Sequence, residues 1–262
     1  MSRMRAGLTA LGMAWGLTGL VQAREVSLCV DPEPPPSAYW ERDAEGRRTD
    51  RLTGATVELL SHVFAQIGLV PKFVAAPWAR CMRWAATGEV DFAVGGYQDE
   101  ERAKTYAFSI AYRAMTPQIY SLRETALRPQ SLQDLKPLHG CGLTGASYAH
   151  YGLKAGSLDQ GVGSYQRLIQ KLTLKRCDYF PDELEMVEAV VRSGQVELAD
   201  AARLFSAPAP WARGPTRHLL AARDGAAAAL LPRIDPALLK ALQDGLGAEL
   251  WRKHGGRTPY QY

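Results

Sequence analysis

From Val26 onward, short apolar segments alternate with helical segments, and this alternation constrains the fold more than any other feature of the sequence. The first helical segment carries apolar residues at a helical spacing and stops at Gly68, a residue type that favours a helix C-terminus. Pro77 suits the first turn of the second. This order, with short connections, predicts a parallel sheet covered on both faces by helices. The predicted elements are strands over 26–30, 70–75 and 90–94 and helices over 54–68 and 77–88.

A second set of alternating elements follows a strand at 118–122. The chain then closes with a strand at 218–223 and an apolar helix at 236–253. The predicted elements of the second set are strands over 140–144, 177–180 and 196–198 and helices over 131–136, 164–175 and 182–194.

These two sets predict two α/β lobes of about 100 residues each. No linker rich in Ser and Gly separates them, so we expect two tight β crossings, near 113–120 and 207–218. The first lobe then comprises 24–114 and 212–262, and the second comprises 115–211. Ligands of open α/β sheets bind beyond the carboxyl ends of the strands. The loops at those ends begin at Asp31, Ala76, Gly95, Gly145 and Pro181.

The first 23 residues are typical of a secretory signal peptide. A basic stub precedes 18 uncharged residues, and the segment ends in Val21-Gln22-Ala23, small residues that suit cleavage after Ala23. A transmembrane anchor is the alternative, because 18 uncharged residues are at the lower limit for spanning a bilayer. Cleavage removes two arginines and lowers the formal charge from +4 to +2. We therefore expect a periplasmic protein with no nucleic-acid partner.

Export also changes what the four cysteines predict. In an oxidising compartment they can form disulfides with three possible connectivities. Cys141 and Cys177 each lie in a predicted strand of the same lobe, so this pair is the first candidate. Four buried free thiols are the alternative.

Five segments, in this order, resemble the type II periplasmic solute-binding proteins, the amino-acid-binding family of ABC importers. They are 77–81 (PWARC), 88–97 (GEVDFAVGGY), 101–112 (ERAKTYAFSIAY), 142–148 (GLTGASY) and 176–183 (RCDYFPDE). The resemblance covers essentially all of the chain after residue 23. It implies two α/β lobes, each a mainly parallel sheet flanked by helices, joined by two β crossovers and closing on one small ligand.

The resemblance also implies roles for individual residues. Arg102 would bind the carboxylate of an amino acid through its bidentate guanidinium, and Asp182 would accept the ammonium group. Trp78 would pack on the ligand, Ser147 would donate a hydroxyl, and Asp31 would face a distal cationic group.

Each of these residues also has a simpler alternative role. Arg102 would be a surface arginine that offsets its acidic neighbours. Asp182 and Ser147 would cap the helices that follow them. Trp78 would fill the core, and Asp31 would be a turn residue.

The chain departs from the family pattern at Gly95, Gly96 and Tyr97, where amino-acid binders usually place Ser or Thr. Backbone N–H groups can still bind an anion there, but the hydroxyl donors are lost and Tyr97 occupies volume. Prolines at 34–36 also stand where an aromatic residue often covers the ligand. Both departures weaken an amino acid as the ligand more than they weaken the fold.

No recognised catalytic or metal motif is present, so we expect no enzyme, metal or cofactor. A formal G-x-G-x-x-G at 140–145 lies in a predicted strand, where it cannot hold a dinucleotide. The expected partners of a monomer are a small-molecule ligand and an ABC permease. The alternatives are a periplasmic enzyme such as a cyclohexadienyl dehydratase, with Asp182 or Glu183 as its acid, and a ligand sensor or delivery protein.

Overall fold

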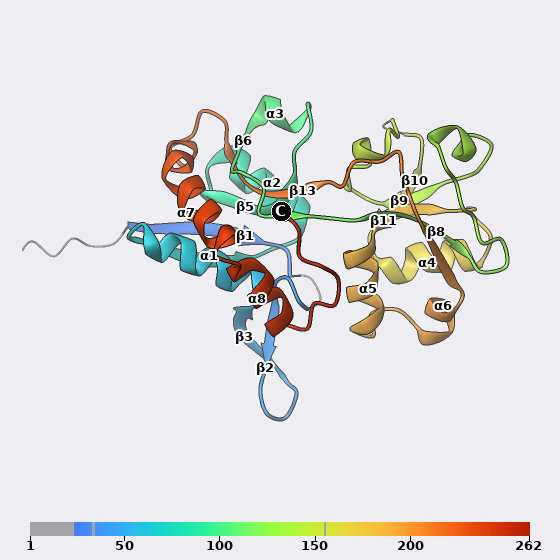
Figure 1. Ribbon diagram of the computed structural model, residues 1–262, viewed down its shortest axis with the longest axis horizontal. Helices are drawn as coiled ribbons and strands as arrows, with labels where there is room; N and C mark the ends of the chain where they lie inside the picture. Colours follow the sequence, from blue (N-terminus) through green and yellow to red (C-terminus); the bar gives the residue numbers. More distant parts are fainter. Residues whose placement is uncertain (1–23, 33–34, 155) are drawn as a thin grey trace, which may run out of the picture.

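The computed structural model describes residues 24–262 except 33–34 and 155, and it shows two α/β lobes side by side (Figure 1). The predicted signal peptide, 1–23, lies outside the described residues. No helix among the described residues is long and apolar enough to cross a bilayer. We keep 24–114 with 212–262 and 115–211 as the proposed first and second lobes.

A six-stranded sheet forms the centre of the first lobe. Its strands are β1 (Arg24–Val30), β4 (Leu69–Ala75), β5 (Phe92–Tyr97), β6 (Tyr106–Phe108), β7 (Arg113–Ala114) and β13 (Thr216–Ala222). β1 runs parallel to both β4 and β5, which confirms the parallel sheet predicted from the alternating pattern. β13 runs antiparallel to β5, β6 and β7.

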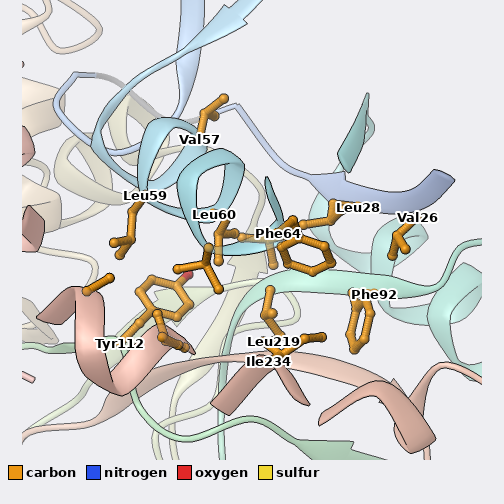
Figure 2. Close-up of a cluster of buried hydrophobic side chains, with 14 of the residues drawn as sticks. Val26, Leu28, Val57, Leu59, Leu60, Phe64, Phe92, Tyr112, Leu219 and Ile234 are labelled. Carbon is orange, nitrogen blue, oxygen red and sulfur yellow. The ribbon is translucent and has the colours of Figure 1, made fainter. Parts of the chain in front are cut away.

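Helices cover both faces of this sheet. They are α1 (Ala55–Gln66), α2 (Trp78–Thr87), the short α3 (Arg102–Thr105), the 3-10 turn η3 (Ala228–Leu230), α7 (Leu231–Gln243) and α8 (Leu246–Lys253). Successive strand residues point to opposite faces, so Leu28 joins the core beneath α1 and α7, whereas Cys29 faces α2. In that core, Phe64 of α1 meets Phe92 of β5 edge-to-face at 6.1 Å (Figure 2).

The second lobe is built on two smaller sheets that adjoin each other. Its strands are β8 (Pro117–Leu122), β9 (Cys141–Leu143), β10 (Asp159–Val162), β11 (Phe180–Glu183) and β12 (Leu204–Pro208). β9 and β10 are parallel, and a parallel bridge between Gly140 and Tyr179 links them to β11. β8 lies antiparallel between β11 and β12, so the prediction of a mainly parallel sheet is wrong for this half of the lobe. β8 enters the second lobe from the first crossing, and β12 leads back toward the second crossing. These two strands therefore run in opposite directions.

The helices of the second lobe differ from the prediction at their boundaries. They are the 3-10 turns η1 (Leu132–Leu135) and η2 (Ala149–Tyr151) and the helices α4 (Tyr165–Thr173), α5 (Leu184–Arg192) and α6 (Leu198–Ala202). α4 begins after Ser164, whose hydroxyl accepts the backbone N–H of Arg167, as its sequence position indicates. The strand predicted at 177–180 is displaced toward the C-terminus, because pairing with β8 continues through Asp182 and Glu183. The strand predicted at 196–198 is wrong, since α6 begins there.

Two further differences concern the first lobe. The helix predicted at 236–253 is broken into α7 and α8, because Gly245 adopts a left-handed conformation with φ of 83°. The hairpin of β2 (Tyr39–Arg42) and β3 (Arg48–Thr53) was not predicted, because half of its strand residues are charged, none is buried and no apolar pattern marks the strands. Figure 1 shows it projecting away from the sheet.

Each lobe contains one disulfide, and no free cysteine is found among the described residues. The predicted pair Cys141–Cys177 is confirmed. Cys29–Cys81 ties β1 to α2. Loops of 36 and 52 residues give a chain-entropy stabilisation of about 4 kcal/mol for each bond.

Candidate ligand-binding site

A cavity of about 410 Å³ lies between the two lobes. Its lining residues come from the carboxyl ends of β1, β5 and β11, as expected for open α/β sheets, and from the loop after β9. The structure brings all eight predicted site residues to this cavity. They are Asp31, Trp78, Gly95, Gly96, Tyr97, Arg102, Ser147 and Asp182.

Asp31 and Trp78 form one corner of the cavity and are bonded to each other. Oδ2 of Asp31 accepts the backbone N–H of Trp78 at 2.8 Å, at the first residue of α2. Helix N–H groups in the first turn lack intrahelical acceptors, so this contact satisfies one of them. Trp78 also packs partly against the core around Cys81 while lining the cavity, so its position is compatible with both roles that the sequence left open.

Arg102 lies at the cavity with a side chain that is 15% exposed, and it also pairs with Asp99, one of the acidic neighbours in the simpler alternative. Its Nη1 donates to the carbonyl oxygen of Tyr97 at 3.0 Å, and its Nε lies 3.7 Å from Oδ2 of Asp99. The guanidinium also lies 6.0 Å from the centre of the Trp78 ring. These contacts hold the guanidinium at the cavity, where it can bind an anionic ligand group.

Gly95 and Gly96 are required by close neighbours. A Cβ on Gly96 would lie 2.6 Å from Leu220 and 3.0 Å from the Trp78 ring. Gly95 has a φ of 101°, and a Cβ there would lie 3.2 Å from Nη1 of Arg217. A side chain at position 96 would therefore force Leu220 to shift, and one at position 95 is disfavoured by the backbone conformation.

Two buried carboxyl groups, Asp182 and Glu183, line the second-lobe side of the cavity. Each residue is 5% exposed. Glu183 accepts two hydrogen bonds: Oε2 from the hydroxyl of Tyr97 at 2.8 Å and Oε1 from Nε2 of His150 at 2.9 Å. Tyr97 belongs to the first lobe, so Glu183 joins the two lobes. Asp182 lies in β11, and its Oδ1 accepts the backbone N–H of Glu183, so the prediction that Asp182 caps a helix is wrong.

The pKa values of these two carboxyl groups are shifted in opposite directions. Burial, reinforced by the charge of Glu183, raises the pKa of Asp182 well above its usual range. Burial alone would raise the pKa of Glu183 too, but the hydrogen bond and charge of His150, with Tyr97 and Arg217, hold it below its usual value. These opposite shifts favour ionisation at Glu183 over ionisation at Asp182.

Ser147 provides a second contact across the cavity. Its hydroxyl donates to Oδ2 of Asp99 at 3.2 Å, which links the loop after β9 to the first lobe. The following turn η2 has no side-chain cap, so the capping alternative for Ser147 is wrong.

Sequence reasoning missed four prominent residues of the cavity wall: Tyr148, Tyr165, Glu183 and Arg217. Glu183 was named only as a possible catalytic acid. Its place as a site residue depends on the extension of β11. Arg217 lies one residue before the predicted last strand. It is only 8% exposed, and nothing in the local sequence indicated that this arginine is buried. Tyr165 follows the Ser164 cap, which was the only local indication of its position.

The sequence matches the family model of bacterial extracellular solute-binding proteins, family 3, over residues 26–256. The chain belongs to this family. A search of curated proteins gives no significant match.

Solved structures with the same fold share little sequence with the solute-binding protein described here. AbpA, an amino acid ABC transporter substrate-binding protein from Streptococcus pneumoniae bound to L-arginine, is 17% identical, with a TM-score of 0.65 over 88% of this chain and 94% of its own. An ABC uptake transporter protein from the same species with bound histidine is 14% identical, with a TM-score of 0.69 over 91% and 95%. A histidine kinase sensor domain is 20% identical, with a TM-score of 0.69 over 90% and 98%. These similarities confirm the type II periplasmic-binding-protein fold.

No group of three or more His, Cys, Asp or Glu side chains among the described residues could hold a metal ion. The G-x-G-x-x-G segment contains β9, and a Cβ on its central Gly142 would meet the ring of Tyr148 at 2.7 Å. This glycine therefore serves side-chain packing.

Proposed function

We propose that this protein captures a small ligand with a cationic group, an amino acid or a related compound, between its two lobes in the periplasm, without chemical change. The observation that carries the proposal is the distribution of charge around the cavity between the lobes. Arg102 and Arg217 line it from the first lobe, and Asp182 and Glu183 line it from the second. A zwitterion would place its anionic and cationic groups against opposite lobes, so binding would favour the closed arrangement.

The aromatic lining supports a ligand with an apolar portion. Trp78, Tyr97, Tyr148 and Tyr165 contribute rings to the cavity from both lobes. A volume of about 410 Å³ lies within the usual range of small-molecule sites. The solved relatives bound to L-arginine and to histidine support an amino acid, and their transporters support delivery to an ABC permease.

Thermal shift against the twenty amino acids, simple amines and small carboxylates tests the proposal, with affinities then measured by calorimetry. The cognate ligand should raise the melting temperature, and Arg102→Ala should abolish that rise. Arg80→Ala is the matched control, because Arg80 belongs to the same proposed lobe but is exposed, does not line the cavity and lies over the Trp84 ring at 5.7 Å. No shift with any amino acid, or an unchanged shift in Arg102→Ala, would contradict the proposal.

A dehydratase is a second candidate, which the opposed pKa shifts of Asp182 and Glu183 favour, because such pairs supply an acid and a base. Incubation with prephenate tests it. Formation of phenylpyruvate that is lost in Asp182→Asn would establish an enzyme, and unchanged prephenate would support binding alone.

A further inference from the structure

The carboxyl groups of Asp182 and Glu183 are adjacent in the chain, equally buried and open to the same cavity. Two buried like charges on adjacent residues repel each other strongly in a medium of low polarity. The contacts around the pair therefore decide which member is ionised.

Glu183 has the contacts that an anion requires. Both of its oxygens accept hydrogen bonds, from the first-lobe hydroxyl of Tyr97 and from the imidazole of His150. The guanidinium of Arg217 adds favourable charge. Asp182 receives much less support, since Oδ1 accepts one backbone N–H and a hydrogen bond from Tyr165 adds only a smaller effect.

Most of the titratable groups that interact with the pair are tyrosines. They are Tyr97 of β5, Tyr120 of β8, Tyr148 and Tyr151 at η2 and Tyr165 of α4. His150 and Arg217 act on Glu183, and Glu185 and Glu188 of α5 act on the nearby Tyr120. Tyrosine hydroxyls that are neutral at physiological pH donate hydrogen bonds but do not neutralise a carboxylate.

We propose that the Asp182–Glu183 pair holds one proton in the ligand-free protein, on Asp182, and that the cationic group of the ligand displaces this proton when it binds. This inference rests on the proposed function, because it concerns the same cavity. The exchange is balanced: an ammonium or guanidinium group pairs with the Asp182 carboxylate, and the released proton passes to the solvent buffer. Capture of a cation would then add no net charge to the buried pair.

Carbon-13 NMR of protein labelled at the Asp and Glu carboxyl carbons tests the first half without any ligand. One carboxyl carbon should remain in its protonated position at pH 7 and disappear in Asp182→Asn. Glu183→Gln should lower the pKa of that carboxyl group, because the neighbouring charge is removed. A wild-type spectrum in which every carboxyl group is ionised at pH 7 overturns the proposal, whether or not the variants fold.

Calorimetry with L-arginine in phosphate and in Tris buffer tests the second half. Wild-type protein should release about one proton per L-arginine bound, and Asp182→Asn should release none. The affinity of the wild type should rise up to about tenfold per pH unit until Asp182 is ionised. Binding without proton release overturns the displacement step. If no cationic compound binds, the proposed function fails as well, whereas the carbon spectrum still decides whether the pair holds a proton.

Discussion

The two lobes contribute opposite charges to the cavity that they share. The first lobe carries both of its lining arginines, Arg102 and Arg217, together with Asp31. The second lobe supplies Asp182 and Glu183 and no lysine or arginine among the described lining residues. In the first-lobe wall, Gly96 lies too close to Leu220 and Trp78 to accept a side chain. In the second-lobe wall, the charge comes from two carboxyl groups, so it depends on pH. One lobe thus provides a closely packed, mostly cationic surface, and the other provides an acidic one.

The largest expected effect tests whether the two disulfides contribute equally to ligand affinity. Replacing Cys29 and Cys81 together by Ala should lower the free energy of unfolding by about 4 kcal/mol, because the unfolded chain gains freedom. Cys29 is two residues before Asp31 and Cys81 is three residues after Trp78, and both of these residues line the cavity, so ligand affinity should fall too. Urea denaturation and calorimetry measure the two effects.

The matched control is Cys141→Ala with Cys177→Ala, which should cost nearly the same stability. Its effect on affinity should be smaller, because only one end of this bond, Cys141, lies within three residues of a lining residue, Leu143, whereas Cys177 is five residues from Asp182. Equal losses of affinity in the two double variants would contradict the difference between the lobes.

The next effect tests the rigidity of the first-lobe wall. Gly96→Ala should cost about 1–3 kcal/mol, because the added methyl group would lie 2.6 Å from Leu220. Gly163→Ala in the second-lobe wall is the control, since its Cβ would meet nothing within 4 Å and its φ is outside the left-handed range. Its melting temperature should be unchanged or higher. A wild-type melting temperature for Gly96→Ala would show that the wall is not tightly packed.

A smaller effect tests the contact between Tyr97 and Glu183. Tyr97→Phe should cost about 1–2 kcal/mol at pH 7, because an ionised buried carboxylate loses a donor. The lowered pKa of Glu183 stabilises the fold above its usual value of 4.5, and this stabilisation is lost as the pH falls through the folded-state pKa. The cost should therefore shrink below pH 4.5.

Tyr106→Phe serves as the control for that variant, because its hydroxyl donates to the carbonyl oxygen of Met82 within the first lobe. Its cost should not follow the protonation of Glu183. Denaturation series at pH 4 and pH 7 distinguish the two variants, and identical pH profiles would argue against an ionised Glu183.

The smallest expected effect concerns Ser147. Ser147→Ala removes the 3.2 Å hydrogen bond to Asp99 and should cost about 0.5 kcal/mol, since the contact is partly open to solvent. Ser157→Ala, which removes a bond to Lys154 inside the second lobe, is the control. If only Ser147→Ala changes the compactness measured by small-angle X-ray scattering, the bond contributes to lobe closure.

Much of the first lobe was predictable because its elements depend on local patterns. The helical spacing before Gly68 and the proline before Trp78 located α1 and α2 within a few residues. The alternation of short apolar strands with helices predicted the parallel pairing of β1 with β4 and β5. The hairpin of β2 and β3 was not predicted, because its partly charged strands have no buried residue and carry no apolar pattern.

The sequence by itself indicated the α/β class, made Cys141–Cys177 the first candidate pair and, through the family resemblance, named eight residues that meet at the cavity. Local periodicity and an ordered set of motifs are properties of the chain, so they can be recognised without coordinates. Only the tertiary structure decided that β11 extends to Glu183, that Arg217 reaches the same cavity and that Tyr97 bonds across it. These features depend on strand pairing and burial between residues more than 30 positions apart. The charge state of Asp182 and Glu183 is decided by that environment, since burial and neighbouring groups shift a pKa and composition does not.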